Sequence, residues 1–259
     1  MTNSPGTLEK ALDLLCLFTS EHLELSASEI AEKLNMPLSS TYKYLQAFQK
    51  RQFLSKNERS NKYYLSLTIL KLGLLAAEKA SVIETASPHL NALVDRSLET
   101  AFLMVPDGLN VICADVRESP RVLKITTRRG STLPLYAGSP GKAVLAFKDQ
   151  SFIDRLIETT GLAKLNMNTI TDIEQMKEEL AAIRRLGYSQ SDSEYVSDVS
   201  SVAAPIFDYT GQVIASVALA GPAERIFGDN QQRLVDLVKE SARDISSKMG
   251  YSENLRKAT

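Results

Sequence analysis

The segment from Ser26 to Lys50 restricts the fold of this chain most, because it predicts two short helices joined by a tight turn. SASEIAEKLN opens with Ser26 and Glu29 in an S-x-x-E capping box, in which two side chains satisfy free N–H groups at a helix start. Asn35-Met36-Pro37 then interrupts the chain, and Pro37 suits the first turn of a new helix. This arrangement is typical of the helix-turn-helix motif.

The second helix, PLSSTYKYLQAFQKR, is amphipathic. Its apolar residues recur at helical spacing, and we expect four of them to face inward: Leu38, Tyr42, Leu45 and Phe48. The opposite side carries hydroxyl groups and cations and no acid, which suits phosphates and base edges in a DNA groove. We therefore predict DNA contacts from five residues of the two helices: Ser28, Ser39, Ser40, Thr41 and Lys43.

The segment RQFLSKNERSNKYYL predicts a β-hairpin. Phe53-Leu54 and the run from Tyr63 to Leu65 are strand-like, and KNERSNK between them is a polar turn. A basic hairpin directly after the recognition helix corresponds to the wing of a winged helix. We expect its cations, Lys56, Arg59 and Lys62, to contact phosphate or a minor groove.

Charge is divided unevenly along the chain. The span from Lys33 to Lys71 holds eight bases and one acid, Glu58, and so has a net charge of +7. Residues 81–259 hold 20 bases and 23 acids, a net charge of −3, although the whole chain is at −1. A basic block beside an acidic remainder indicates a polyanion-binding module joined to a part with another role. A solvated charged surface is the alternative interpretation of such a block.

The rest of the chain predicts an antiparallel α+β domain. Leu67 to Ala80 is amphipathic and predicts a linker helix. After it, hairpin-connected strands alternate with clusters of helices, which favours α+β. The expected strands are TAFLMV, LNVICADV, RVLKIT, SVAAPIFD and QVIASVALA. We therefore expect a winged helix over residues 1–66, a linker helix over 67–80 and a second domain over 81–259.

The stretch GSPGKAVLAF looks at first like a phosphate-binding loop, but its spacing excludes a nucleotide site of the Walker A type. The first glycine of that motif would fall on Tyr136, and the hydroxyl after the lysine is replaced by Ala143. No G-x-S-x-G elbow is present. The Cys and His residues lack metal-ligand spacing, so we expect no metal. Paired carboxylates at Asp192 and Glu194 could share one side of a strand, as surface acids or as acid–base groups.

The chain resembles the IclR family of bacterial transcription regulators over roughly residues 7 to 250. Pro37, Ser39, Ser40, Lys43 and Leu45 match the family's recognition helix, although the family more often has arginine at the position of Lys43. YYLSLTILKLG matches the end of the wing. LPLYAGSPGKAVLA, GYSQSDSEYVSDVSSVAAPIFDYTG and ASVALAGPAER match the family's GAF-like effector-binding domain.

The resemblance implies a small organic effector, such as an aromatic or carboxylic acid, held at the start of the helix after Ala137. It implies an effector site formed by Leu123, Leu133, Ala137, Gly138, Ser139, Gly141, Asp192, Glu194 and Ser201. Pro140 lacks the N–H that family members with small acids could use. Ser191 and Ser201 stand where a carboxylate and a cysteine are common, which points to a larger or more apolar effector.

We therefore expect a DNA-binding transcription regulator with no catalytic residues and no cofactor, which binds a double-stranded operator as a dimer or tetramer. No uncharged apolar run approaches the roughly 18 residues of a membrane span. With only two cysteines, both in apolar runs, a reducing cytoplasmic location is expected. The alternative is a small-molecule sensor or enzyme whose winged helix contacts protein instead of DNA.

Overall fold

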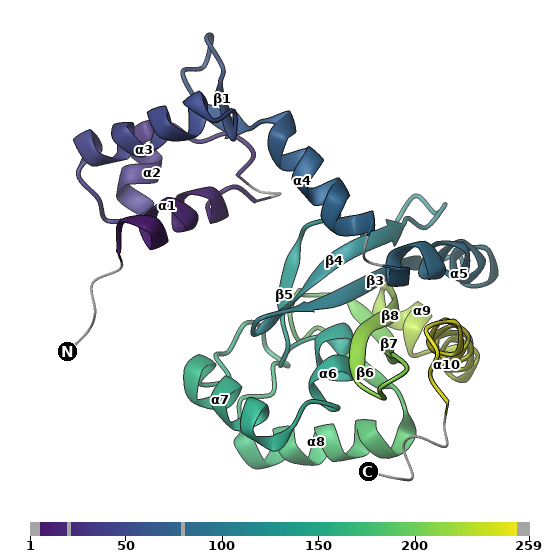
Figure 1. The fold of residues 1–259 in the computed structure, drawn as a ribbon. Coiled ribbons are helices and arrows are strands. Elements are labelled where there is room, and N and C mark those ends of the chain that lie inside the picture. Colours follow the sequence, from purple (N-terminus) through teal and green to yellow (C-terminus); the bar gives the residue numbers. More distant parts are fainter. Residues whose placement is uncertain (1–5, 20–21, 79–80, 253–259) are drawn as a thin grey trace. The chain divides into compact units, whose positions relative to one another are not determined.

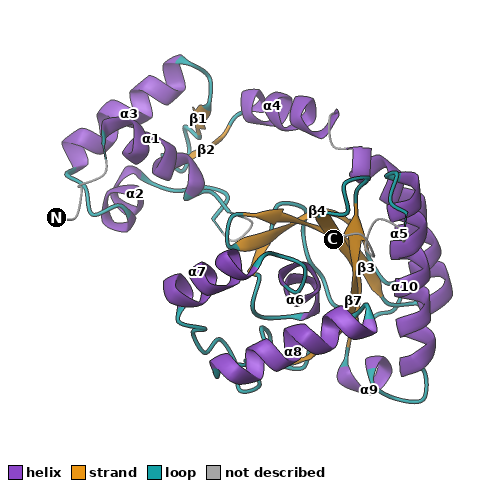
Figure 2. Cartoon of the chain, turned by 60° about the horizontal axis from the view of Figure 1, so that its bottom comes forward, coloured by secondary structure: helices purple, strands orange, loops and turns teal. Residues whose placement is uncertain are grey.

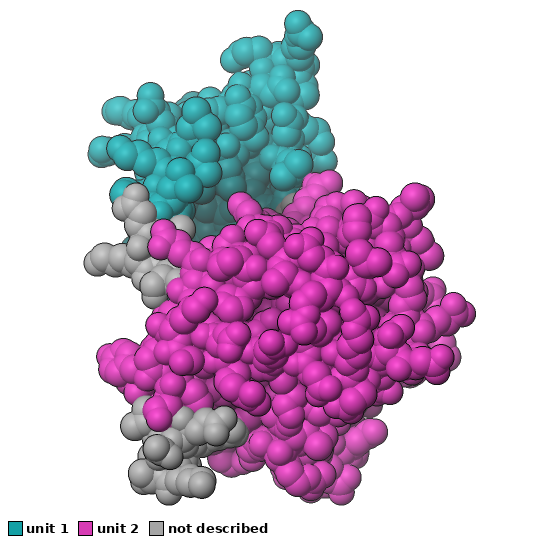
Figure 3. Space-filling view, turned by 90° about the vertical axis from the view of Figure 1, so that its right-hand side faces the viewer, with its two compact units in different colours: residues 1–80 teal, residues 81–259 magenta. Residues whose placement is uncertain are grey.

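The computed structural model describes residues 6–19, 22–78 and 81–252 of the 259-residue chain. The chain divides into two compact units, residues 1–80 and residues 81–259 (Figure 3). Each unit has its own buried apolar core, one in the first unit and two in the second.

The first unit is a winged helix (Figure 1). It consists of α1 (Thr7–Cys16), α2 (Ala27–Lys33), α3 (Leu38–Lys50), β1 (Leu54–Lys56), β2 (Tyr63–Leu65) and α4 (Leu67–Glu78). Leu25 pairs with Tyr63 through two backbone bonds of 3.0 and 2.7 Å, so the segment before α2 joins the hairpin. The core is formed by Leu14, Leu25, Ala27, Ile30, Leu45, Leu54 and Tyr63.

The buried face of α3 differs from the predicted one. Leu45 is buried and Phe48 packs against the core, as expected, but Leu38 and Tyr42 are about half exposed. Thr41 takes their place inside and is fully buried. Pro37 is the N-cap of α3, so Leu38 is the first helical residue and its side chain lies beyond the edge of the small core.

The second unit is built on a six-stranded antiparallel sheet with strand order β5-β4-β3-β8-β7-β6 (Figure 2). The strands are β3 (Thr100–Asp107), β4 (Asn110–Arg117), β5 (Thr132–Pro134), β6 (Ser189–Asp192), β7 (Ser200–Phe207) and β8 (Val213–Gly221). The central strands β3, β7 and β8 are buried over most of their length. The predicted α+β class is therefore confirmed.

Helices cover both faces of this sheet (Figure 1). On one face lie α5 (Ser81–Ser97), α9 (Ala223–Ile226) and α10 (Gln231–Lys248), which pack on Leu103, Val217 and their neighbours. On the other lie α6 (Ser139–Leu145), α7 (Gln150–Thr160) and α8 (Ile173–Leu186), which pack on Phe102, Ala218 and their neighbours. The sheet is thus buried between two separate apolar layers.

The predicted strand RVLKIT does not form. Residues 121–126 are irregular, and the strand next to β4 is β5, six residues further along. Side chains satisfy the carbonyl groups of this segment: Thr100 Oγ1 donates to Ile125 O at 2.6 Å, and Arg225 Nη2 donates to Leu123 O at 3.0 Å. Backbone groups that side chains satisfy have no need of a neighbouring strand.

Helix α6 is buried along its whole length and lies against the backbone that precedes it. A Cβ atom at Gly141 would lie 2.6 Å from Pro134 O and 2.9 Å from Leu135 O. Real Cβ atoms do not approach backbone oxygens so closely. Gly141 is therefore required by the packing of α6 on the chain around β5.

Candidate nucleic-acid interface and effector site

The start of α2 carries the predicted capping box. Glu29 N donates to Ser26 Oγ at 3.2 Å, and Ser26 N donates to Glu29 Oε2 at 2.6 Å. The backbone and hydroxyl bonds from Ser26, with Lys62 close by, lower the pKa of the exposed Glu29 carboxyl to about 2. The carboxylate form of Glu29 therefore fixes the first turn of α2.

The exposed face of α3 presents the predicted polar residues with one exception. Ser39 and Lys43 are exposed, and Ser40 is partly exposed. Thr41 is not available for contact with another molecule, because its side chain is buried and its Oγ1 donates to Pro37 O at 3.2 Å. Helical rotation explains the difference, since Thr41 is one turn before the core residue Leu45 and points the same way.

The wing is a hairpin whose turn is held by Asn57. Asn57 Oδ1 accepts from Arg59 N at 3.0 Å, and Asn57 Nδ2 donates to Glu24 Oε1 at 3.2 Å. Arg59 is exposed at the tip. Lys56 Nζ lies 5.8 Å from the centre of the Tyr63 ring. Lys62 forms an ion pair with Glu29, since its Nζ lies 3.4 Å from Glu29 Oε1, and its charge is therefore partly neutralised.

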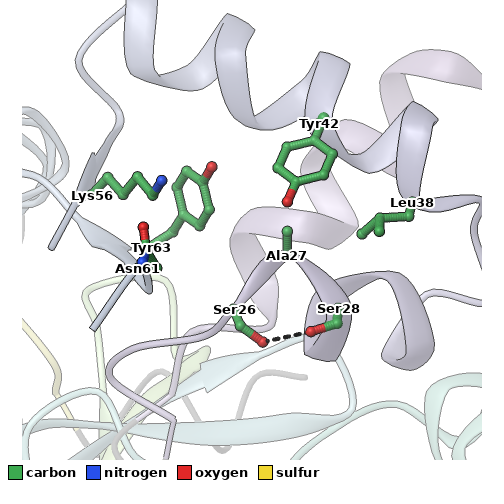
Figure 4. Close-up of a pocket in the computed structure, with 8 residues that line it drawn as sticks. All are labelled: Ser26, Ala27, Ser28, Leu38, Tyr42, Lys56, Asn61 and Tyr63. Atoms are coloured by element: carbon green, nitrogen blue, oxygen red, sulfur yellow. Dashed lines mark hydrogen bonds between the residues drawn. The ribbon is translucent and has the colours of Figure 1, made fainter. Parts of the chain in front are cut away.

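A hollow of about 230 Å³ lies where α2, α3 and the wing meet (Figure 4). Tyr42 reaches it from α3 and Tyr63 from β2, while Ser26 and Ser28 lie at the start of α2. Lys56 supplies a cation on the wing side. Tyr42, which was expected in the core, is thus a polar-tipped residue of the surface that carries the predicted DNA contacts.

In the second unit, the position next to the start of α6 is filled by the chain's own carboxylate. Glu194 Oε2 accepts from Gly138 N at 3.1 Å, and Glu194 Oε1 accepts from Lys142 Nζ at 2.5 Å. Lys142 is itself fully buried and also donates to Glu179 Oε1 at 2.7 Å. Burial raises the pKa of Glu194, while Lys142 and the Gly138 N–H act in the opposite direction.

Serine hydroxyls line the sheet face that α6 covers. Ser139 Oγ and Ser201 Oγ are 2.7 Å apart, and Ser216 Oγ donates to Pro140 O at 2.9 Å. Ser191 pairs with Ser201 across β6 and β7, so it shares this face. Ser189, two residues earlier, is 1% exposed, and its Oγ has no hydrogen-bond partner among the described residues.

The other predicted effector residues fall in three different environments. Ala137, Gly138 and Gly141 are buried around the start of α6, and Leu133 Cδ1 would lie 3.4 Å from a Cβ at Gly138. Leu123 is 68% exposed and contributes a backbone oxygen to Arg225. The expected pairing of Asp192 with Glu194 on one side of a strand is wrong.

The chain turns between Asp192 and Glu194. β6 ends at Asp192, and Ser193 has a φ of 51°, which lies in the left-handed region. Asp192 is exposed and accepts from Ser200 Oγ at 2.8 Å on the face opposite to Ser191. The residue of this segment that faces α6 is Ser191, and the i, i+2 spacing of Ser189 and Ser191 is the signal that could have identified it.

The described residues contain no cluster of three or more His, Cys, Asp or Glu side chains able to hold a metal ion. Within the same residues, no helix is long and apolar enough to cross a membrane.

Two family models match the chain, one in each unit. The model of the IclR helix-turn-helix domain matches residues 7–58, and that of the bacterial transcriptional regulator IclR C-terminal domain matches residues 74–247. The HTH-type transcriptional regulator KipR of Bacillus subtilis is 31% identical, with 97% of this chain and 100% of KipR covered.

Solved structures agree with these matches. Thermotoga maritima IclR has a TM-score of 0.71 at 30% identity, with 95% of this chain and 99% of that chain covered. An IclR homologue from Microbacterium hydrocarbonoxydans, crystallised with 4-hydroxybenzoate, has a TM-score of 0.82 at 21% identity over 95% of this chain and 100% of that one, so it shares the fold.

The winged helix and the sheet domain define a DNA-binding transcription regulator with a separate effector-binding domain. The chain belongs to the IclR family of bacterial transcription regulators.

Proposed function

We propose that the first unit binds duplex operator DNA through the exposed face of α3, with the wing and the start of α2 on neighbouring phosphates. The observation that carries this proposal is that α3 has no acid and keeps Ser39 and Lys43 exposed. Lys43 is a point charge without the planar fork of arginine, so we assign it to a phosphate. Arg59 and Lys56 on the wing take the same role.

We propose further that the effector binds where α6 faces β6 and β7. Three serine hydroxyls converge there, those of Ser139, Ser191 and Ser201, and the buried Ser189 hydroxyl has no partner among the described residues. Buried polar groups normally have partners, so an unsatisfied hydroxyl marks a place for a ligand or water. These groups suit hydroxyl, carbonyl or amide functions.

The charge at this site argues for an uncharged effector. The buried Glu194 carboxylate already accepts the Gly138 N–H and the Lys142 ammonium, and Glu179 shares the same lysine. A ligand carboxylate would add a third acid to one buried base, and like charges in a desolvated site repel strongly. We therefore propose a neutral, hydroxylated or amide-bearing molecule as the effector, without catalysis of its conversion.

We also propose that the protein acts in the bacterial cytoplasm as a dimer or tetramer, with α1 and α4 in the contact. The large apolar residues exposed on these helices are Leu8, Leu12, Leu67, Leu70, Leu72, Leu74 and Leu75. Exposed leucines at this density are typical of protein–protein contacts. Helix α4 follows the wing and connects the two units of the chain. Effector binding can therefore change DNA affinity only if the effector binds more tightly to one arrangement of the associated chains than to another.

A two-stage experiment tests these proposals with the full chain. Fluorescence anisotropy on DNA fragments from around the chain's own gene gives affinity and its salt dependence, and binding that falls steeply with salt is expected. Thermal-shift screening then compares neutral polyols and amides with carboxylic acids of the same size. Salt-independent or absent DNA binding would favour a protein partner for the winged helix, and stabilisation by the acids alone would contradict the neutral effector.

A further inference from the structure

A groove of about 950 Å³ lies on the second unit between the end of α8, the helix α10 and the outer edge of β7. We refer to it as the α8–α10 groove. Its walls carry three cations, Arg184, Lys239 and Arg243, and two hydroxyl groups, those of Ser246 and Ser247. The lining contains no acid. None of these residues belongs to the serine-lined face that α6 covers.

The groove is lined by positive charge alone because the lining cations of α10 and most of its acids lie on different sides of the helix. On its groove side Lys239 and Arg243 are four residues apart, one above the other on the helix. Two of the three acids of α10 face α5 instead: Glu240 Oε2 accepts from Arg96 at 2.9 Å, and Asp244 interacts with His89. The third, Asp236, accepts from Gln232 at 2.9 Å. The cations of the groove are therefore not neutralised by their own helix.

Two of the three cations are held in place by backbone oxygens, and one is free. Lys239 Nζ donates to Leu186 O at 2.9 Å at the end of α8, and Arg184 Nε donates to Ala146 O. Both bonds leave further donors of the same groups for a ligand. Arg243 is exposed and forms no hydrogen bond or ion pair among the described residues.

The outer edge of β7 disfavours an added β-strand as the occupant. Ser193 N donates to Val199 O, so these two residues form a hydrogen-bonded pair of the β6–β7 ladder. In such a ladder every second residue bonds the same neighbour, so the odd-numbered residues of β7 direct their backbone N–H and C=O groups toward the β6 side. Beyond the end of β6 these are Pro205, which has no N–H, and Phe207, whose N–H donates to Ser246 Oγ at 3.0 Å. This edge offers an added strand carbonyl acceptors but no donors, which disfavours pairing with another strand.

We propose that the α8–α10 groove is a second ligand site, which binds a small anion with two or more carboxylate or phosphate groups. Arginine guanidinium groups bind both oxyanions through paired N–H donors, and the exposed Ser247 hydroxyl adds a further donor, whereas Ser246 Oγ already donates to Ala242 O. The volume accommodates a molecule of the size of citrate or larger. Arg184 also donates to the backbone oxygen of Ala146, the residue directly after α6. A ligand bound to Arg184 is therefore linked through this side chain to α6, the helix of the proposed effector site.

The proposal is tested by isothermal titration of the full chain with citrate and, separately, with pyrophosphate, at constant ionic strength. Saturable binding of either anion with a stoichiometry near one per chain is expected, and the better ligand identifies the class. Arg243→Glu is expected to weaken binding by about tenfold or more, because a charge-assisted contact is replaced by repulsion. Arg243→Lys keeps the charge and retains part of the affinity.

Arg185→Glu is the matched control, because Arg185 is exposed, is next to Arg184 and does not line the groove. It is expected to bind the anions as the unmodified chain does. Equal weakening by both glutamate substitutions would mean general charge attraction and would overturn the proposal. So would the absence of saturable binding, or an oligomer in sedimentation that Arg243→Glu dissociates, since the groove would then be a contact between copies.

Discussion

The two units of this protein treat their charged residues in opposite ways. In the winged helix the cations lie on the surface, and the ion pair Lys62–Glu29 is exposed on both sides. In the sheet domain Lys142 is fully buried and binds both Glu179 and Glu194. Arg225 donates two hydrogen bonds, of 2.6 and 2.9 Å, to the carboxylate of Glu99. Surface charges attract a large charged partner, whereas buried charge networks fix the shape of a small site.

The largest test of this difference is the removal of a buried cation. Lys142→Met leaves Glu194 and Glu179 without their shared base, and breaking a buried pair costs about 3–5 kcal/mol of unfolding free energy. Urea unfolding of the full chain, followed by circular dichroism, measures it. Lys62→Met in the exposed pair is the control and is expected to cost less than about 1 kcal/mol. Similar costs for the two variants would abolish the contrast.

The second test concerns Lys43, an exposed cation that we propose contacts DNA. Lys43→Ala is expected to weaken operator binding by about tenfold and to reduce the slope of log affinity against log salt by about one, because one phosphate contact is lost. Its unfolding free energy is expected to change by less than about 0.5 kcal/mol. Lys164→Ala, an exposed lysine of the sheet domain, is the control. An unchanged salt slope for Lys43→Ala would remove this residue from the interface.

A third test uses pH, since the two units are expected to respond with opposite signs. The pKa of Glu29 is about 2 in the folded chain and 4.5 in the unfolded chain, so its stabilisation is present above pH 4.5 and is lost as pH falls toward 2. Burial raises the pKa of Glu194, so its effect on stability becomes more favourable as pH falls toward 4.5.

Thermal unfolding between pH 7 and pH 3 separates the two carboxyl groups. Glu29→Gln is expected to flatten the loss of stability below pH 4.5, whereas Glu194→Gln is expected to remove a gain that occurs above it. Glu58→Gln changes an exposed acid of the wing that forms no bond among the described residues, and it serves as the control. Parallel pH curves for Glu29→Gln and the unmodified chain would contradict the role of the capping carboxylate.

The smallest expected effect comes from Thr41. Its hydroxyl donates to Pro37 O inside the unit, so Thr41→Val is expected to cost about 1 kcal/mol of unfolding free energy and to leave the DNA affinity of the folded protein unchanged. Ser39→Ala, on the exposed face two residues earlier, is expected to weaken DNA binding and to leave the unfolding free energy nearly unchanged. A lower DNA affinity of Thr41→Val at a temperature where the protein is fully folded would return Thr41 to the interface.

Local patterns in the sequence were sufficient for the helix-turn-helix, the wing and four of the sheet strands. Capping, proline position and apolar spacing act over a few residues and can be recognised in one segment. The positions of Thr41 and Tyr42 could not be predicted in this way, because the core next to α3 is too small to cover its first turn. Helical spacing predicts which way a side chain points, but it does not predict how far the neighbouring core extends along the helix.

The proposed effector site shows the same limit over longer distances. Glu194 lies beside Gly138, 56 residues earlier, and only the fold brings the two together. The strand expected at 121–126 was replaced by loop because Thr100 and Arg225, distant in sequence, satisfy its carbonyl groups. Asp192 and Ser191 point to opposite faces of β6, and one residue of register reverses every side chain of a strand, so the residue that faces α6 depends on the exact register.

The close packing at Gly141 has a consequence for how such a regulator can change its specificity. Any side chain at this position would push α6 away from Pro134 and Leu135, so the position tolerates no variation. Ser139 and the facing residues of β6 and β7 carry no such backbone restriction. If the proposed effector site is right, a lineage that acquires a new effector is expected to vary residues 139, 191 and 201 while keeping Gly141 constant, which separates the inherited frame of the site from its adaptable lining.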